Sequence, residues 1–377
     1  MSEQPADDNN GEENREVGAE NERDDLSINA NCSSNRKLSF YSTFFSKPPI
    51  PENTRNFNYC TEEIFESHNL EELILEARGR QEQLTTEFSQ ILLLQITNAL
   101  HLLHEHGKAH GSLDASVVYF VKNKKYIILG EQHDDSINGT SYEFSQDSVK
   151  RDMVFNANLH CFVLTNGVHE VFSEQVTSSD LKCLDSEIAL DLMRKMSGNY
   201  DTKQALKHPF YWTVKNKIVY LNESCETTRC KDIKDAKKVF KNDSSARVIP
   251  LGGWIKKLDL TKQDMSRLKR RKIRGPVKIQ IIADLTKPKK NTNRKIKFEN
   301  TCIFDLLRFF RNHYVHMNEN EEPVKECFEK SDAGYWNFFS TRFPKLFMHI
   351  YTIMISYKKF NVEEITYNKP LPDSPFE

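Results

Sequence analysis

Apolar residues recur at helical spacing along much of this chain, and this periodicity constrains its fold more than any other feature. The segment FSQILLLQITNALHLLHEHG predicts a buried helix that stops at Gly107, because glycine is the usual residue just past a helix. Its apolar face consists of Leu92, Ile96, Ala99, Leu100 and Leu103. In IFDLLRFFRNHYVHM the apolar positions i, i+3, i+4 and i+7 are Ile303, Leu306, Leu307 and Phe310. The pattern predicts a mainly α fold.

Other segments extend this prediction. NLEELILEARG indicates a short helix whose apolar side holds Leu70, Leu73 and Leu75. The runs VVYF at 117–120 and YIIL at 126–129, separated by KNKK, predict a small β-hairpin. Further helices are expected in DMVFNANLHCFVLTNG up to Gly167, in IALDLMRKM and ALKHPFYW, and in FPKLFMHIYTIMISYKKF with Pro344 in its first turn.

Charge is segregated along the chain although the formal net charge is only -1. Residues 1–31 carry ten acidic side chains and two arginines, whereas residues 256–297 carry sixteen lysines and arginines and three aspartates. Residues 1–56 are acidic and rich in Asn and Ser, and such a composition cannot bury enough apolar surface to offset ordering entropy. A disordered acidic tail is expected there, and a second short tail over 363–377. A chain of 377 residues then has room for two ordinary domains.

The cysteines and the N-terminus indicate the compartment. Eight cysteines occur without a CxxC pair or regular spacing, which is typical of reduced thiols. The N-terminus lacks the basic start and apolar stretch of a signal peptide, and no run approaches the length of a transmembrane helix. The expected location is cytoplasmic, possibly nuclear.

Several motifs in order carry a resemblance to known proteins. AHGSLDASVVYF at 109–120 lies where protein kinases have their catalytic loop, and VLTNGVHEVF at 163–172 and ALKHPFYW at 205–212 follow. FDLLRFFRNHYVHM and STRFPKLFMHIYTIM come next, and together they resemble the two signature helices of a kinase-extension nuclease (KEN) domain. The chain is similar to the family that contains the inositol-requiring unfolded-protein-response sensor and ribonuclease L.

The resemblance implies an architecture. A protein-kinase C-lobe without an N-lobe is expected over 57–213, followed by an all-helical KEN ribonuclease domain over 214–362 that includes the basic segment 256–297. Phosphoryl transfer needs a Gly-rich loop, a catalytic aspartate and magnesium ligands. The matching positions are degenerate and are occupied by His110, Ser112, Asp114, Val117 and Glu131. A pseudokinase that binds neither ATP nor magnesium is therefore predicted.

His110 and Asp152 are interpreted as buried hydrogen-bonding groups that hold this loop to the following helix. His101, His104, His106 and His110 could suggest a zinc site. The first three are expected on different faces, however, and no cysteine has ligand spacing, so no metal is predicted.

Cleaving RNA without metal requires a base for the 2′-OH proton, an acid for the 5′-oxygen and donors for the phosphorane. The resemblance gives these roles to Arg311 and Asn312, which would bind the scissile phosphate, and to His316, which would transfer a proton. Asn312 and His316 are four residues apart and face one way if the helix persists. A solvated helix face is the alternative interpretation.

One position departs from the family pattern. The sensor branch has a tyrosine thirteen residues before the arginine, and this chain has Phe298, which cannot exchange a proton. If that tyrosine is the second acid or base, its role must pass to a neighbour, and the candidates are Tyr314, His313 and Tyr357.

The basic segment suits a polyanion, since clustered cations replace its counterions. The cations expected to bind RNA are Lys269, Arg270, Arg271, Lys272 and Arg274. A nuclear-import signal and a solvated lysine-rich loop remain alternatives.

Two functions are consistent with this sequence. The first is an endoribonuclease that leaves 2′,3′-cyclic phosphate ends, related to unfolded-protein-response mRNA processing and acting as a dimer. The second is an inactive pseudoenzyme that binds RNA, or that heterodimerises with a full-length sensor and regulates it.

Overall fold

The structure is a computed structural model whose described residues all belong to one compact unit. It describes residues 40–42, 69–121, 126–130, 144–229, 238, 240, 248, 253–258, 266, 298–320 and 322–356.

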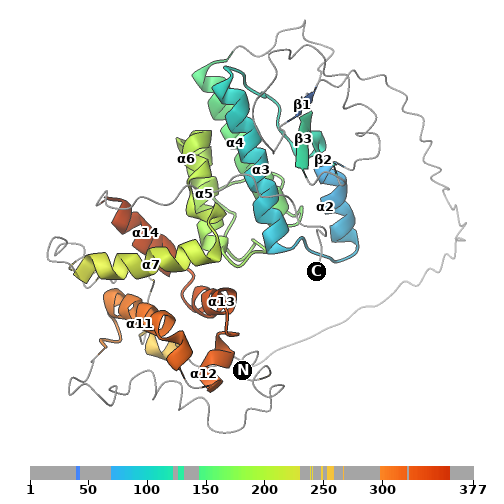
Figure 1. The fold of residues 1–377 in the computed structure, drawn as a ribbon. Coiled ribbons are helices and arrows are strands. Elements are labelled where there is room, and N and C mark those ends of the chain that lie inside the picture. The colour runs from blue at the N-terminus through green and yellow to red at the C-terminus, as the bar shows by residue number, and fades with distance from the viewer. Residues whose placement is uncertain are drawn as a thin grey trace, which may run out of the picture. The chain divides into compact units, whose positions relative to one another are not determined.

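The described chain is mainly α, as the helical periodicity predicts (Figure 1). The helices of its first half are α2 (Leu70–Gly79), α3 (Thr86–Glu105), α4 (Gln146–Leu164), α5 (Ser186–Gly198) and α6 (Thr202–Leu206). Those of its second half are α7 (Val214–Arg229), α11 (Ile303–Val315), α12 (Glu322–Cys327), α13 (Asp332–Arg342) and α14 (Leu346–Ser356). Short 3-10 turns are η1 (Ala115–Val117), η3 (Pro209–Tyr211), η5 (Ile255–Leu258) and η6 (Met317–Glu319).

A small antiparallel sheet accompanies the helices, in the order β1-β3-β2. The predicted hairpin is confirmed: β2 (Val118–Val121) pairs with β3 (Tyr126–Gly130), with Tyr119 opposite Ile128. The third strand, β1 (Phe40–Ser42), pairs with the other edge of β3. The expectation of a tail over 1–56 therefore does not hold at these three residues.

The first helices begin at side-chain caps. In α2, Asn69 Oδ1 accepts from the Glu72 backbone N–H at 2.8 Å, and Glu72 returns a bond to the Asn69 N–H. α2 buries Leu70, Ile74 and Ala77, while Leu75 is 48% exposed. The prediction for Leu75 is thus wrong, because the buried stripe follows i, i+4 and i+7 from Leu70.

Two boundaries also differ from the sequence prediction. α4 begins at Gln146, six residues before the predicted segment, because Ser145 and Ser148 form a capping box. Pro344 lies in the turn before α14, not in its first turn, and the helix starts at Leu346. The predicted end of α3 is confirmed: the helix stops at Glu105 and Gly107 has a φ of 66°.

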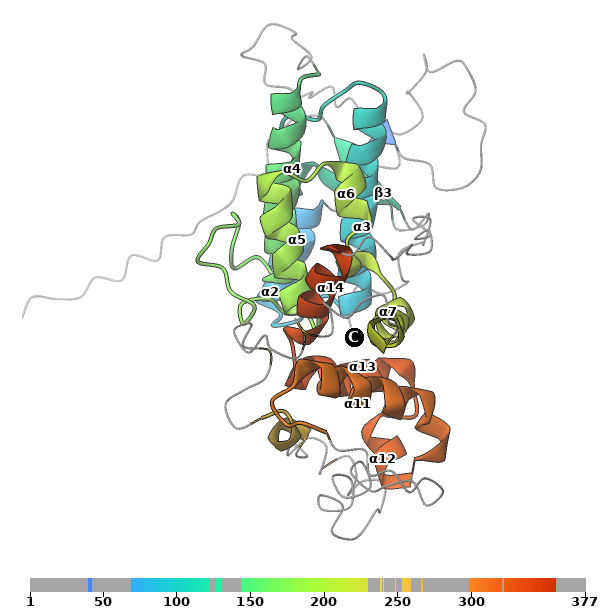
Figure 2. The ribbon, with the colours of Figure 1, turned by 90° about the vertical axis from the view of Figure 1, so that its left-hand side faces the viewer.

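Long helices pack together in the first half. α4 packs against α3 and α5, and α3 contacts α6 (Figure 2). Thr97, Asn156, His160 and Tyr211 form a buried polar network among them. The five apolar residues predicted for the buried face of α3 are all buried.

One hydrophobic core continues from the first half into the second. α7 lies beside α11, α13 and α14, and α14 also contacts α5 (Figures 1 and 2). A buried ion pair reinforces this junction: Asp185, just before α5, accepts from Lys217 Nζ of α7, and its other oxygen accepts from Trp336 Nε1 of α13 at 2.8 Å. Nowhere in the described chain is a helix sufficiently long and apolar to cross a lipid bilayer.

Candidate nuclease site

Helix α11 has one buried face and one accessible end. Its four predicted apolar positions are all nearly or fully inaccessible to solvent. At its start, Asp305 accepts from the Glu299 N–H at 2.7 Å and from Arg308 Nη1 at 2.8 Å. The buried stripe fixes the rotation of the helix, so the polar residues of its last turn, from Arg311 onward, are only partly covered.

Two of the three predicted site residues are in direct contact. Arg311 Nη1 donates to Asn312 Oδ1 at 3.3 Å, and Arg311 retains 24% side-chain exposure. The same guanidinium binds a carboxylate from another helix, since Arg311 Nε lies 2.6 Å from Glu226 Oε1 of α7. A planar fork of N–H donors beside an amide is suited to two oxygens of one phosphate.

His316 ends α11 as its C-terminal cap. Its backbone N–H still donates to Asn312 O at 3.2 Å, so the helical turn between the two residues persists, as the prediction required. Its side chain turns to Glu319 of η6, with 2.7 Å between Nδ1 and Glu319 Oε1. Among the described residues, no side-chain contact joins His316 to Arg311 or Asn312. With Nδ1 bound to a carboxylate, Nε2 is the ring nitrogen that can exchange a proton with a substrate.

The candidates for a second acid or base differ in their surroundings. The Tyr314 hydroxyl donates to Asp332 Oδ1 at 3.0 Å, and burial together with that carboxylate raises the pKa of Tyr314 to about 12. The His313 ring lies against Phe309, with 4.5 Å between ring centroids. Tyr357 falls outside the described residues. Tyr314 is therefore a poor proton donor near neutral pH.

Phe298 belongs to an aromatic cluster. Its ring centroid lies 6.0 Å from that of Trp254 and 5.8 Å from that of Phe309, and the Arg308 guanidinium lies over it. A phenyl ring suits these contacts, and no atom in it exchanges a proton. Phe298 therefore lacks the hydroxyl with which a tyrosine at this position could transfer a proton.

Comparison with known proteins bears on this helix and its surroundings. A sequence model of the ribonuclease 2-5A family matches residues 237–367, which include α11 to α14. The serine/threonine-protein kinase/endoribonuclease ire-1 of Caenorhabditis elegans is 25% identical over 207 residues, which is 50% of this chain. The 2-5A-dependent ribonuclease of Mus musculus is 24% identical over 312 residues, or 77% of this chain. Residues 237–367 of this chain therefore belong to the kinase-extension nuclease family.

A plant relative extends the set: the serine/threonine-protein kinase/endoribonuclease IRE1 of Oryza sativa subsp. japonica is 27% identical over 157 residues, or 41% of this chain. The matched regions cover 18% of the nematode protein, 14% of the rice protein and 36% of the mouse protein. This chain thus spans only a minor part of these relatives' lengths.

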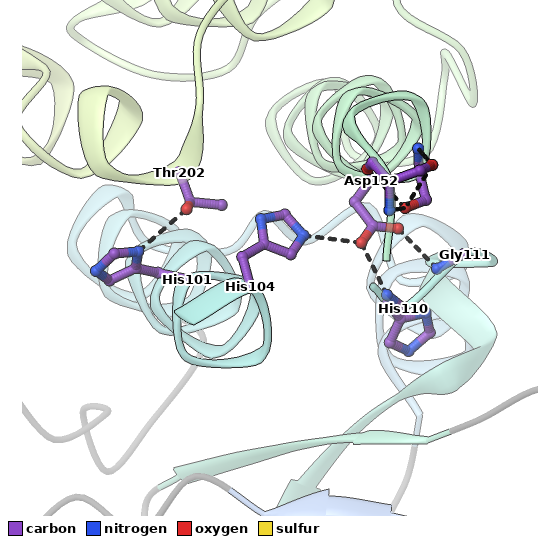
Figure 3. A network of polar contacts seen from close by, with 8 residues as sticks. His101, His104, His110, Gly111, Asp152 and Thr202 are labelled. Carbon is purple, nitrogen blue, oxygen red and sulfur yellow. Dashed lines mark hydrogen bonds and ion pairs between the residues drawn. The ribbon is translucent and has the colours of Figure 1, made fainter. Parts of the chain in front are cut away.

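The loop at the kinase-like positions of this chain is held by Asp152 of α4 (Figure 3). Its carboxylate accepts from the backbone N–H groups of His110 and Gly111, at 2.8 and 2.7 Å, and lies 2.9 Å from His104 Nε2. His110 Nε2 lies 2.8 Å from Gly130 O of β3. The interpretation of His110 and Asp152 as buried scaffold groups is confirmed.

The remaining kinase-like positions have local roles. Asp114 caps η1 by accepting from the Ser116 N–H at 2.8 Å, and Val117 is buried in the core. Ser112 is partly buried, and Glu131 lies outside the described residues. A buried isopropyl group at Val117 offers no ligand atom for a metal.

The histidines considered for zinc have separate partners. His101 Nδ1 lies 3.1 Å from Thr202 Oγ1, whereas His104 contacts Asp152 (Figure 3). His106 Nδ1 lies 2.7 Å from Leu102 O. The prediction that these three point to different faces is confirmed. Elsewhere, Glu299, Cys302 and Asp305 bring one ligand atom each within 4.8 Å of one another, but Asp305 is already bound by Arg308 and the Glu299 N–H.

Two further parts of the site are the predicted RNA-binding cations and Glu226, which the sequence did not predict. The five cations predicted to bind RNA, Lys269 to Lys272 and Arg274, lie outside the described residues. Glu226 was not anticipated. It is separated from Arg311 by 85 positions in the sequence and lies on an ordinary charged helix, so only the packing of α7 on α11 reveals it.

Proposed function

We propose that this kinase-extension nuclease is a metal-independent endoribonuclease that leaves 2′,3′-cyclic phosphate ends. The observation that carries the proposal is the contact between the Arg311 guanidinium and the Asn312 amide on the partly exposed last turn of α11, within the residues matched to the ribonuclease 2-5A family. That turn offers donors for the phosphorane oxygens, and His316 follows on the same turn with its Nδ1 held by Glu319.

RNA is the expected partner. The sixteen lysines and arginines of residues 256–297 precede α11 directly in the sequence, and clustered cations bind a polyanion by releasing its counterions. Affinity should therefore fall steeply as salt concentration rises. Two of the relatives are named endoribonucleases and a third a 2-5A-dependent ribonuclease, which supports the same substrate class.

The first half is proposed to be a scaffold. It would form a degenerate kinase C-lobe over 57–213, joined to a nuclease domain over 214–362, and would bring two nuclease subunits together without ATP or magnesium. The buried Val117 and the capping role of Asp114 support this loss of phosphoryl transfer. Action on mRNA in an unfolded-protein response, in the cytoplasm or nucleus, is the corresponding cellular proposal.

A second function is favoured by Phe298. Because that ring has no exchangeable proton and is packed among aromatic side chains, the chain could instead be an inactive pseudoenzyme. It would then bind RNA, or heterodimerise with a full-length sensor and regulate it.

Cleavage of a labelled RNA hairpin in EDTA, at several protein concentrations, tests the first function. We expect cyclic phosphate products, a specific activity that rises with protein concentration as dimers form, and loss of roughly 100-fold or more in His316→Ala, the usual contribution of a proton-transferring group. His106→Ala, which changes an exposed histidine at the end of α3, is the matched control.

The results of this assay distinguish the two proposed functions. Products that require added metal, or equal cleavage by His316→Ala and the parent, would contradict the proposed mechanism. Absence of cleavage together with RNA binding or sensor pairing would establish the regulator instead.

A further inference from the structure

The proposed reaction needs two proton-transferring groups, and only His316 is so far assigned. An attacking 2′-oxygen must lose its proton, and the leaving 5′-oxygen must gain one. Phe298 supplies neither, and the Tyr314 hydroxyl is bound to Asp332 with a raised pKa. We therefore consider, beside His313 and Tyr357, the side chains that contact Arg311.

Glu226 has the required position. It stands on α7, which packs against α11, and its Oε1 lies 2.6 Å from Arg311 Nε. In RNA the 2′-OH and the 3′-phosphate are attached to neighbouring carbons of one ribose. A base for the hydroxyl and a cation for the phosphate must consequently lie next to each other. Glu226 and Arg311 satisfy this requirement.

The accessibility of the pair also fits this role. Glu226 keeps 47% of its side-chain surface exposed and Arg311 keeps 24%. An ion pair this open contributes little to stability, so an incoming phosphate can share the guanidinium at little cost. A buried pair such as Asp185 and Lys217 would resist the same rearrangement.

We propose that Glu226 is the general base of this site and that His316 is its general acid, an inference that rests on the proposed function. The Glu226 carboxylate takes the 2′-OH proton while the 2′-oxygen forms a bond to phosphorus. The bond from phosphorus to the 5′-oxygen breaks, and the imidazolium of His316 gives its proton to that oxygen. The products are a 2′,3′-cyclic phosphate and a 5′-hydroxyl, and water then returns both side chains to their starting protonation.

Each group also has a neighbour that suits its role. The Glu226 carboxylate lies beside the Arg311 guanidinium, so a hydroxyl next to a phosphate bound there would face the carboxylate. His316 Nδ1 lies 2.7 Å from Glu319 Oε1, which leaves Nε2 as the ring nitrogen for the leaving oxygen. Phe298 is then not a defect, because the missing hydroxyl is replaced from another helix.

The test compares Glu226→Gln with Glu223→Gln in the full chain. Both substitutions remove one negative charge from an exposed position of α7, and only Glu226 contacts Arg311 in the described structure. Cleavage is measured on the labelled hairpin, and affinity on the same hairpin with 2′-O-methyl groups, which cannot react. We expect Glu226→Gln to lose about 100-fold or more in cleavage with affinity equal or higher, and Glu223→Gln to match the parent.

A second variant separates chemistry from folding. Glu226→Ala with added formate should recover part of its cleavage, because a free carboxylate can enter the space of the deleted one, whereas His316→Ala should not. A hairpin carrying sulfur in place of the scissile 5′-oxygen provides the complementary test. Thiolate leaves without a proton, so the defect of His316→Ala should shrink and that of Glu226→Gln should remain.

Two results overturn the inference. Cleavage by Glu226→Gln at or above the parental level, with His316→Ala still inactive, would show that the carboxylate only restrains Arg311 and would leave the nuclease function standing. A parent protein that does not cleave at all would remove both the function and this role.

Discussion

The imidazole of His160 is enclosed by uncharged partners. Its Nδ1 lies 2.8 Å from Asn156 O and its Nε2 lies 2.6 Å from the Tyr211 hydroxyl. The residue has no solvent exposure, and burial, reinforced by the nearby His208, lowers the pKa of His160 to about 4. The fold therefore accommodates this side chain only in its neutral form.

A pH dependence of stability follows. In the unfolded chain His160 titrates near 6.5 and in the folded protein near 4, so the unfolded state binds more protons between these values. The contribution of neutral His160 to the free energy of unfolding should be fully present above pH 6.5. It should be lost as pH decreases toward 4, which lowers the free energy of unfolding by up to roughly 3 kcal/mol. Urea unfolding at a series of pH values measures the slope.

His160→Gln, which retains an amide for the Tyr211 hydroxyl, should show a shallower slope over the same range. His106→Gln changes an exposed histidine and should keep the parental slope. An identical slope in all three proteins would mean that His160 is protonated without cost. Burial also lowers the pKa of His208, so some slope should remain in His160→Gln.

At the scale of elements, the junction of α5, α7 and α13 depends on one buried charge pair. Lys217 is fully buried, and its ammonium binds the Asp185 carboxylate, which also accepts from Trp336. Two charges removed from water stabilise a fold little as a pair, but each becomes costly when the other is deleted.

Lys217→Met should therefore lower the free energy of unfolding by about 3–5 kcal/mol, because Asp185 is left as an unpaired buried carboxylate. The double variant Lys217→Met with Asp185→Asn should recover part of this loss, since the neutral amide oxygen still accepts from Trp336. Chemical denaturation of the parent, both single variants and the double variant gives the coupling energy. Additive losses would contradict the assignment.

The elements predictable from sequence are those governed by local periodicity and turns. α3, α11 and the β2–β3 hairpin follow from apolar spacing and from the polar break between the strands. β1 does not, because a strand of three residues has no periodicity to detect and is defined by its partner β3. α4 starts earlier than predicted because Ser145 and Ser148 form a capping box. The sequence alone does not identify these two serines as a cap, because that role depends on where the helix begins.

The same division applies to the site. Arg311 and Asn312 share one helix turn, so their proximity follows from their spacing and from the continuation of α11 to Val315. Glu226 enters through tertiary packing, which no spacing records. Nor could the sequence show that Glu319 holds His316 Nδ1, since this depends on how the chain turns into η6.

At the scale of the molecule, one core runs through both segments that the sequence suggests are separate domains. Trp212 packs edge-on against Phe347 and Tyr351 of α14, and the Asp185–Lys217 pair crosses the same junction. Separating the segments would expose these aromatic faces to water. Each half therefore depends on the other for part of its apolar burial.

We accordingly expect the residues from α2 to α14 to unfold in a single cooperative transition. Calorimetry should give equal calorimetric and van't Hoff enthalpies, and the near-ultraviolet and far-ultraviolet circular dichroism signals should change together. Two resolved transitions would instead mean that the nuclease segment is stable without the kinase-like one.

The pairing of Glu226 with Arg311 also bears on where a working unit of this family can be cut. The ribonuclease 2-5A match starts at residue 237, yet the carboxylate that contacts the Arg311 guanidinium comes from a helix that ends at Arg229. A fragment cut at the boundary of sequence similarity would keep the proposed acid, His316, and lose the proposed base, Glu226. A fragment that is to retain the proposed reaction must therefore include all of α7.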